Sequence, residues 1–224
     1  MTLNLVEKID DFVKINRVLV SVSDKDGLEA FITALLQINP DIQFFSTGGT
    51  YQKILSILGG KADCLTQVSA YTGQPETQGG LVKTLDFKIY LGLLTETYNE
   101  AHQADLKRTQ AVPIDMVVVN LYPFEQTVAG PETSVEKART HIDIGGPCMI
   151  RAAAKNFIRV ASVVTPADYP MIVDDMRKTS GHLSLKQRFS LAQKAFSHTA
   201  DFDRAIADFL LTKTPADAAG CYQL

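Results

Sequence analysis

A run of small hydroxyl and glycine residues gives the clearest chemical signal in the sequence. It reads Phe-Ser-Thr-Gly-Gly-Thr over positions 45–50, between a run typical of a buried strand and a run typical of a helix. Glycines let the backbone approach an anion, hydroxyl groups donate hydrogen bonds, and the first N–H groups of a helix have no partner inside it. The segment therefore predicts a phosphate cradle, with a glycine turn and a hydroxyl helix cap as the alternative. The residues of this cradle are Ser46, Thr47, Gly48, Gly49 and Thr50.

Three further segments place polar residues where predicted strands end or begin. Ser21 and Lys25 follow the first strand, Lys83 and Thr84 precede another predicted strand, and Asn120 and Tyr122 close a third; each group alone could serve as a cap or a solvated surface. The carboxyl ends of parallel strands meet at one edge of a sheet, which is where ligands bind in α/β proteins. We therefore expect these groups to gather with the cradle.

Residues 143–147 open a predicted helix that runs through Asn156. Gly145 and Gly146 would admit a ligand to the backbone at the helix start, and Asp143 is either a helix cap or a functional carboxylate. Arg151 and Lys155 are four residues apart and share one face, which for an isolated pair is typical of a solvated surface.

The elements that must position these groups alternate along the chain. Short runs rich in β-branched and apolar residues predict strands at 17–22, 42–45, 89–94, 116–120 and 160–164. Apolar residues at three- and four-residue spacing predict helices at 26–38, 50–58 and 134–142. This alternation predicts an α/β fold with a mainly parallel sheet and helices on both faces.

The last 41 residues have a different pattern. Residues 184–211 predict one long helix, so we divide the chain into an α/β domain at 1–183 and a C-terminal helical extension with its tail at 184–224. We expect the tail from residue 212 to be loosely held. Residues 69–80 lack an apolar period and predict a loop near the site.

Composition excludes several classes of partner. With a formal net charge of −3, the 224-residue chain has no overall basic field, which disfavours nucleic acid and anionic membranes as partners. The widely spaced Cys64, Cys148 and Cys221 predict free thiols rather than a zinc site or disulfides. No secretory leader and no apolar run of about 18 residues is evident, so we expect a soluble, cytoplasmic protein.

Together the motifs resemble the IMP cyclohydrolase domain, which forms the amino-terminal half of the bifunctional purine-biosynthesis protein and has a methylglyoxal-synthase-like fold. The resemblance runs from about residue 17 to residue 210. It rests on the motifs SVSDK, STGGT, VKTL, IDMVVVNLYPF, IDIGGP, RAAAKN and KAFSHTADFDRAI. A transformylase domain follows in the family, and we expect it to be absent from a chain that stops at Leu224.

The resemblance implies a reaction and a set of site residues. The reaction closes the purine ring of a formamido-imidazole-carboxamide ribotide to give inosine monophosphate (IMP) and water, with no metal or cofactor. The resemblance makes Lys83 and Lys155 partners of the oxyanion and carboxamide, with Tyr122 and Asp143 handling protons. It implies a phosphate site of Ser21, Lys25, Ser46, Thr47, Gly48, Gly49 and Thr50, and a base site of Thr84, Asn120, Ile144 and Gly145. A homodimer and a separate transformylase are the protein partners left open.

One segment departs from the family pattern. The family reads Arg, His, Pro, His and Gly at the positions of Leu81, Asp86, Phe87, Tyr90 and Leu91. The lost arginine predicts weak cyclohydrolase activity, with partial recovery in Leu81→Arg. It also favours a second hypothesis, a non-catalytic ribotide-binding or regulatory subunit. A third hypothesis is a methylglyoxal-synthase-type lyase, which needs a carboxylate and a histidine near a triose phosphate; the NLYPF and RAAAKN motifs argue against it.

Overall fold

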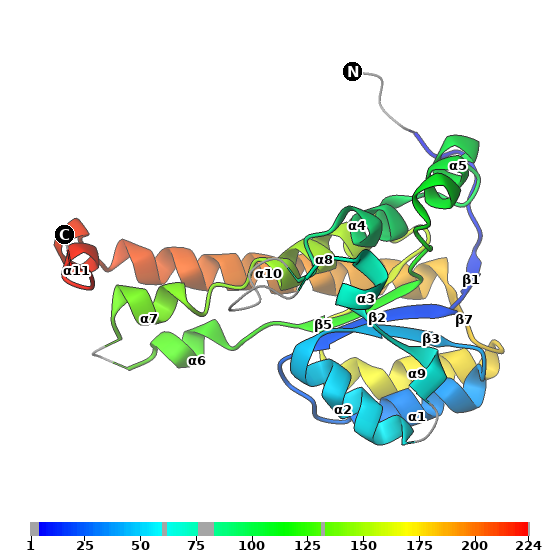
Figure 1. The fold of residues 1–224 in the computed structure, drawn as a ribbon, viewed down its shortest axis with the longest axis horizontal. Coiled ribbons are helices and arrows are strands. Elements are labelled where there is room, and N and C mark those ends of the chain that lie inside the picture. The colour runs from blue at the N-terminus through cyan, green and yellow to red at the C-terminus, as the bar shows by residue number, and fades with distance from the viewer. Residues whose placement is uncertain (1–4, 60–61, 76–82, 131–132, 224) are drawn as a thin grey trace.

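A five-stranded parallel sheet forms the centre of the molecule (Figure 1). The computed structural model describes residues 5–59, 62–75, 83–130 and 133–223. The sheet has the order β4-β3-β2-β5-β6, and every neighbouring pair is parallel. The strands are β2 (Arg17–Val22), β3 (Gln43–Ser46), β4 (Leu65–Gln67), β5 (Met116–Asn120) and β6 (Ala161–Val163). The predicted mainly parallel α/β fold is confirmed.

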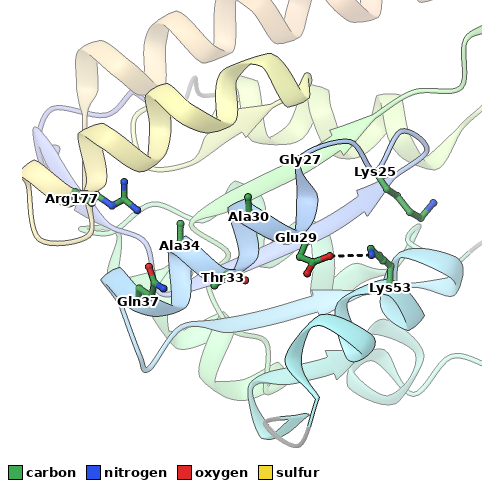
Figure 2. A pocket seen from close by; sticks show the side chains of 9 residues that line it. All are labelled: Lys25, Gly27, Glu29, Ala30, Thr33, Ala34, Gln37, Lys53 and Arg177. Atoms are coloured by element: carbon green, nitrogen blue, oxygen red, sulfur yellow. Dashed lines mark hydrogen bonds and ion pairs between the residues drawn. The ribbon is translucent and has the colours of Figure 1, made fainter.

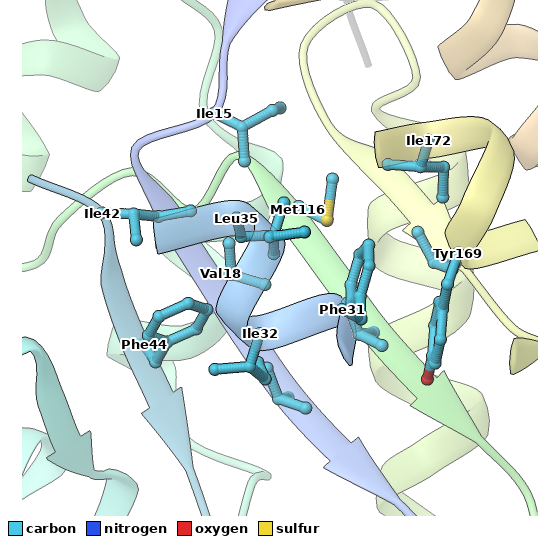
Figure 3. Close-up of a cluster of buried hydrophobic side chains, with 14 of the residues drawn as sticks. Ile15, Val18, Phe31, Ile32, Leu35, Ile42, Phe44, Met116, Tyr169 and Ile172 are labelled. Carbon is cyan, nitrogen blue, oxygen red and sulfur yellow. The ribbon is translucent and has the colours of Figure 1, made fainter. Parts of the chain in front are cut away.

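Helices cover both faces of the sheet because the strands are apolar on both sides, as is usual for parallel strands. Val18 and Val20 face the core on one side of the sheet, and Leu19 between them faces the core on the other. Figure 3 shows the first core, where side chains of α1, β2 and β3 meet Tyr169 and Ile172 of α9. The helices on this face are α1 (Leu28–Ile38), α2 (Gly48–Leu58) and α9 (Tyr169–Lys178); on the other face lie α4 (Phe87–Leu94), α8 (Gly145–Lys155) and α10 (Leu185–Leu211).

The prediction of a strand at residues 89–94 is wrong, because this segment is helix α4. The Asp86 carboxylate caps the helix by accepting a hydrogen bond of 2.8 Å from the backbone N–H of Lys88. A Cβ at Gly92 would stand only 2.4 Å from the carbonyl oxygen of Val112, so glycine lets the helix lie directly on the chain before β5. A short apolar run fits a buried strand and a buried helix equally well, and the cap decides between them. Strand β4 has no counterpart among the predicted strands.

The remaining elements connect this framework. Strand β1 pairs with β7 in a separate antiparallel ribbon. Residues 69–72, predicted as loop, belong to helix α3. The connecting elements are β1 (Phe12–Lys14), η1 (Ala62–Cys64), α3 (Val68–Thr72), α5 (Glu100–Thr109), α6 (Phe124–Val128), α7 (Val135–Arg139), η3 (Pro166–Asp168), β7 (His182–Ser184) and α11 (Pro215–Ala219).

Helix α10 follows the predicted long helix and starts at a capping box formed by Ser184 and Gln187. Its first half packs on α8 and β6, while its second half extends beyond the sheet beside α6, α7 and α11 (Figure 1). The tail forms the short capped helix α11, which buries none of its residues, and the Tyr222 hydroxyl donates to Glu136 of α7; a loosely held tail stays a prediction. The division at residue 184 stays a prediction; buried residues of α10 share a core with those of α8.

Among the described residues, none of the three cysteines forms a disulfide. Within the same residues, no helix combines the length and the apolar character that a membrane crossing requires.

Candidate functional site

A pocket of about 640 Å³ lies at the carboxyl ends of β2, β3 and β5. Strand β2 is central; the chain runs outward from it through β3 to β4 and then crosses back to β5 on the other side of β2. Such a reversal of strand order opens a crevice in which α/β proteins bind ligands. All predicted site residues line this pocket except Ser46 and Lys155. The lining set is Ser21, Lys25, Thr47, Gly48, Gly49, Thr50, Lys83, Thr84, Asn120, Tyr122, Asp143, Ile144 and Gly145.

A second hollow lies on the outer face of α1 (Figure 2). Its charged groups do not converge, because Lys53 is paired with Glu29 at 3.5 Å and Arg177 stands toward the opposite end of the helix. We therefore take the pocket at the strand ends as the candidate site.

The glycines of the cradle form the start of α2. Thr47 is the N-cap residue of the helix, and its side chain makes no capping hydrogen bond. Gly48 has a φ of +50°, in the left-handed region that favours glycine. A Cβ built on Gly48 would lie 3.5 Å from the Lys83 Nζ, so the ammonium group stands beside the first turn of the helix. Helix N–H groups and a cation at one point make an anion-binding site.

Two predicted phosphate ligands have other tasks. Ser46 is fully buried, and its hydroxyl donates to the carbonyl of Val20 at 2.7 Å. The Thr50 hydroxyl accepts from the N–H of Val22 and donates to the same residue's carbonyl, both at 3.1 Å. These hydroxyls hold β3 and α2 against the end of β2. These two hydroxyls therefore shape the cradle, and the groups that stay available to an anion there are the backbone, Thr47 and nearby cations.

Asn120 fixes the loop that follows β2. Its side-chain oxygen accepts from the N–H groups of Ser23 and Asp24 at 2.7 and 2.9 Å, and its Nδ2 donates to the Asp24 carbonyl at 2.8 Å. Asn120 therefore positions this loop, and because Nδ2 has a second N–H and the residue lines the pocket, its predicted contact with the base stays a prediction. Ser23 lines the pocket as well, and the sequence-based set missed it although it stands between Ser21 and Lys25.

Close approaches explain both glycines at the start of α8. A Cβ on Gly145 would lie 2.5 Å from the Thr84 Oγ1, and one on Gly146 would fall within 3 Å of Asp143 and Leu121 side-chain atoms. The Asp143 Oδ1 accepts from the N–H of Gly146 at 3.1 Å. The glycines therefore make room for neighbouring side chains, both of them line the pocket, and Asp143 both caps the helix and lines the pocket.

Tyr90, one of the residues that depart from the family pattern, lies near Asp143. Its hydroxyl is buried next to the Cys148 thiol. Burial raises its pKa most strongly, and the nearby Cys148 thiol and Asp143 carboxylate raise the pKa further. Tyr90 therefore stays a neutral phenol.

Residues 140–144 complete the wall between α7 and α8. Tyr122 and Ile144 are more than half exposed and stand at the mouth of the pocket. His141 also lines the pocket and is missing from the predicted set. Its place two residues before Asp143 was the signal that could have drawn attention to it.

Lys155 does not reach this pocket. It is the exposed last residue of α8, about 15 Å along the helix axis from Gly145 at a rise of 1.5 Å per residue. Leu81 lies outside the described residues. Lys88, the nearest cation along the chain, donates to the Tyr71 carbonyl at 3.2 Å and does not line the pocket.

Comparison with family models gives two matches. The MGS-like domain model matches residues 27–148, and the AICARFT/IMPCHase bienzyme model matches residues 153–223. The first match spans the cradle, the Asn120 segment and the start of α8.

Similar proteins include two named "Bifunctional purine biosynthesis protein PurH". The one from Ruminiclostridium cellulolyticum is 46% identical over 88% of this chain, and the one from Chlorobium phaeobacteroides is 44% identical over 92%. The matches span only 37% and 38% of those relatives. A solved structure described as "Crystal structure of ForH" superposes with a TM-score of 0.72 at 29% identity, covering 87% of this chain and 98% of that one.

Proposed function

Since the chain belongs to the MGS-like domain family, we propose that it acts as an IMP cyclohydrolase, closing the purine ring of a formamido-imidazole-carboxamide ribotide. The observation that carries the proposal is a single pocket that joins an anion-binding helix start to a wall bearing Asp143. A ribotide needs both, because its phosphate and its reacting arms lie at opposite ends. The names of the two relatives support a place in purine biosynthesis.

The phosphate end belongs at the start of α2. The backbone N–H groups of Gly48 and Gly49, the Thr47 hydroxyl and the ammonium groups of Lys25 and Lys83 are the groups available there. The Lys25 Nζ lies 3.4 Å from the Val22 carbonyl and 3.3 Å from that of Ser23, which keeps it on this loop. Two cations and a helix start together offset the charge of a phosphate.

The base end belongs at the start of α8. Ring closure needs the carboxamide nitrogen held against the formyl carbon, donors for the oxygen that gains negative charge, and groups that move protons. We propose that Tyr122 and the first turn of α8 face that oxygen and that Asp143 takes part in proton transfer. Ile144 and Thr84 bound the base.

The direct test is formation of IMP from the formylated ribotide by the purified chain. We expect turnover, and we expect Lys83→Ala to lower kcat/KM by about 10- to 150-fold, the equivalent of one charged hydrogen bond of about 1.5–3 kcal/mol. Lys53→Ala is the matched control, since Lys53 sits on the outer face of α2 and pairs with Glu29. IMP binding without turnover would favour a non-catalytic ribotide-binding subunit, and neither binding nor turnover would refute the proposal.

The substitution at Leu81 leads to a second assay. One missing charged hydrogen bond predicts activity about 10- to 150-fold below that of a relative with arginine, and partial recovery in Leu81→Arg. We measure melting temperature with kcat/KM, because a less stable and no faster variant would mean that arginine has no partner there.

A lyase acting on a triose phosphate is the second candidate, because a carboxylate and an imidazole, from Asp143 and His141, line the same pocket. Release of inorganic phosphate from dihydroxyacetone phosphate tests it. We expect none, since the lining of the pocket extends through Tyr122 and Ile144 beyond what a triose requires.

A further inference from the structure

His141 lies on the wall that carries Asp143, in the turn between α7 and α8. Its ring is partly buried and borders the pocket. The chain has four histidines, and the other three, His102, His182 and His198, do not line this pocket. His141 therefore supplies the imidazole at the candidate site.

Hydrogen bonds fix which ring nitrogen of His141 carries the proton. The Nδ1 lies 2.9 Å from the Lys137 carbonyl, which can only accept a hydrogen bond. It also lies 3.2 Å from the Thr140 hydroxyl oxygen. That hydroxyl directs its own proton to the Lys137 carbonyl at 2.8 Å. Both neighbours of Nδ1 are therefore acceptors, so Nδ1 is the donor and Nε2 keeps its lone pair.

This arrangement suits a general base, because the imidazole ring is held in one orientation. A backbone carbonyl that accepts from Nδ1–H holds the ring and fixes its tautomer, as second partners of functional histidines do. The Asp143 carboxylate, in contrast, already accepts from the N–H of Gly146 through Oδ1. In the neutral ring, the described residues thus leave Nε2 available on the same wall as a partly engaged carboxylate.

We infer that His141 is a catalytic residue that transfers a proton during ring closure, an inference that rests on the proposed cyclohydrolase function. As the carboxamide nitrogen bonds to the formyl carbon, Nε2 accepts one proton from that nitrogen. The π electrons of the formyl carbonyl move to its oxygen, and the imidazolium returns the proton to this oxygen. The former formamide nitrogen then gives its proton to the hydroxyl, its electron pair forms the C=N bond, and the C–O bond breaks to release water.

The kinetic test compares His141→Gln with His182→Gln in the full chain. His182 is the matched control because its Nδ1 also contacts a backbone carbonyl, that of Thr179 at 2.8 Å, yet it lies in β7 outside the pocket. We expect His141→Gln to lower kcat by about 100-fold, the usual contribution of a positioned proton-transfer group, and His182→Gln to leave kcat unchanged. In His141→Ala, added imidazole should restore part of the lost kcat.

Two readouts separate failure of this inference from failure of the proposed function. Wild-type chain that forms no IMP refutes the proposed function, and the role of His141 in it. Wild-type turnover with an undiminished His141→Gln variant refutes the role of His141 alone. A loss confined to KM, matched by weaker binding of IMP, would show a binding role and would likewise overturn the inference.

An NMR titration with IMP adds a readout that does not need turnover. We expect the ring nitrogens of His141 to report an Nδ1–H tautomer in the free chain and to shift when IMP binds. Shifts of the Gly48 and Gly49 amides with an unmoved His141 ring would place the ligand out of its reach and overturn the inference.

Discussion

The two ends of α8 differ in what they do, although the family resemblance assigned chemistry to both. At the first end, Asp143, Ile144 and Gly145 line the pocket. At the far end, Lys155 is exposed, and Asn156 donates to the carbonyls of Leu93 and Thr95 at 2.7 and 3.0 Å. The helix thus carries its site-facing groups at its start and its structural groups at its end.

The end of α8 and the residues after it support the site through hydrogen bonds that hold neighbouring segments in place. The buried Arg159 donates to the carbonyls of Thr95 and Ile114 at 2.9 and 3.1 Å, and to that of Gly92. Together with Asn156 it fastens the end of α4, whose start follows the segment bearing Lys83. The RAAAKN motif can therefore hold the site in place without touching the ligand.

The largest expected effect is the loss of turnover in Asp143→Asn. The amide oxygen can still accept from the Gly146 N–H, so the cap persists while the base is lost. We expect kcat to fall by about 10²- to 10⁴-fold with a nearly unchanged melting temperature. Asp174→Asn on α9 is the control, and parental turnover in Asp143→Asn would remove Asp143 from the proton-transfer set.

Asn156→Leu should instead reduce stability. The carbonyls of Leu93 and Thr95 each lose one buried hydrogen bond, although Arg159 still donates to the Thr95 carbonyl, so we expect a cost of about 1–3 kcal/mol in free energy of unfolding. Urea denaturation measures this, and kcat per folded molecule should stay close to the parental value. A specific loss of kcat at full stability would mean that this end of α8 takes part in the chemistry.

Gly48→Ala should weaken ligand binding at the other side of the pocket. A residue with a Cβ pays about 1–2 kcal/mol for the left-handed φ of +50° that Gly48 adopts. We expect a fall in stability of that size and weaker IMP binding by calorimetry. Gly49→Ala is the control, because its Cβ would meet nothing within 4 Å and its φ is not positive. Equal effects of both changes would contradict the account.

The smallest effect is expected for Lys155→Ala. Exposed surface substitutions change stability by less than about 0.5 kcal/mol, and we expect kcat/KM to stay within about 2-fold of the parental value. A loss as large as that of Lys83→Ala would contradict the division of α8. It would require that a second copy of the chain brings its Lys155 to the pocket.

Local patterns predicted most of the framework. The Met116–Asn120 run and the long α10 helix were evident because a continuous β-branched run and a sustained helical period each fit one structure. Residues 89–94 were misassigned because their apolar run has no distinctive period, and the capping role of Asp86 was overlooked.

The sequence predicted the location of the candidate site better than the tasks of its individual residues. Strand ends brought the cradle, Asn120 and Asp143 to one edge, as the order of elements implied. The hydroxyls of Ser46 and Thr50 donate hydrogen bonds to strand β2, to residues 26 and 28 positions earlier in the chain. No local sequence pattern could reveal such distant partners. The position of Lys155 depends on the direction of α8 relative to the sheet, which sequence spacing does not specify.

A crystal structure of the chain with IMP tests the central claim most directly. The account predicts the phosphate on the N–H groups of Gly48 and Gly49 near Lys83, and the base on the wall that carries His141 and Asp143. IMP bound beside Lys155, or in the hollow on α1 with the cradle empty, would contradict it.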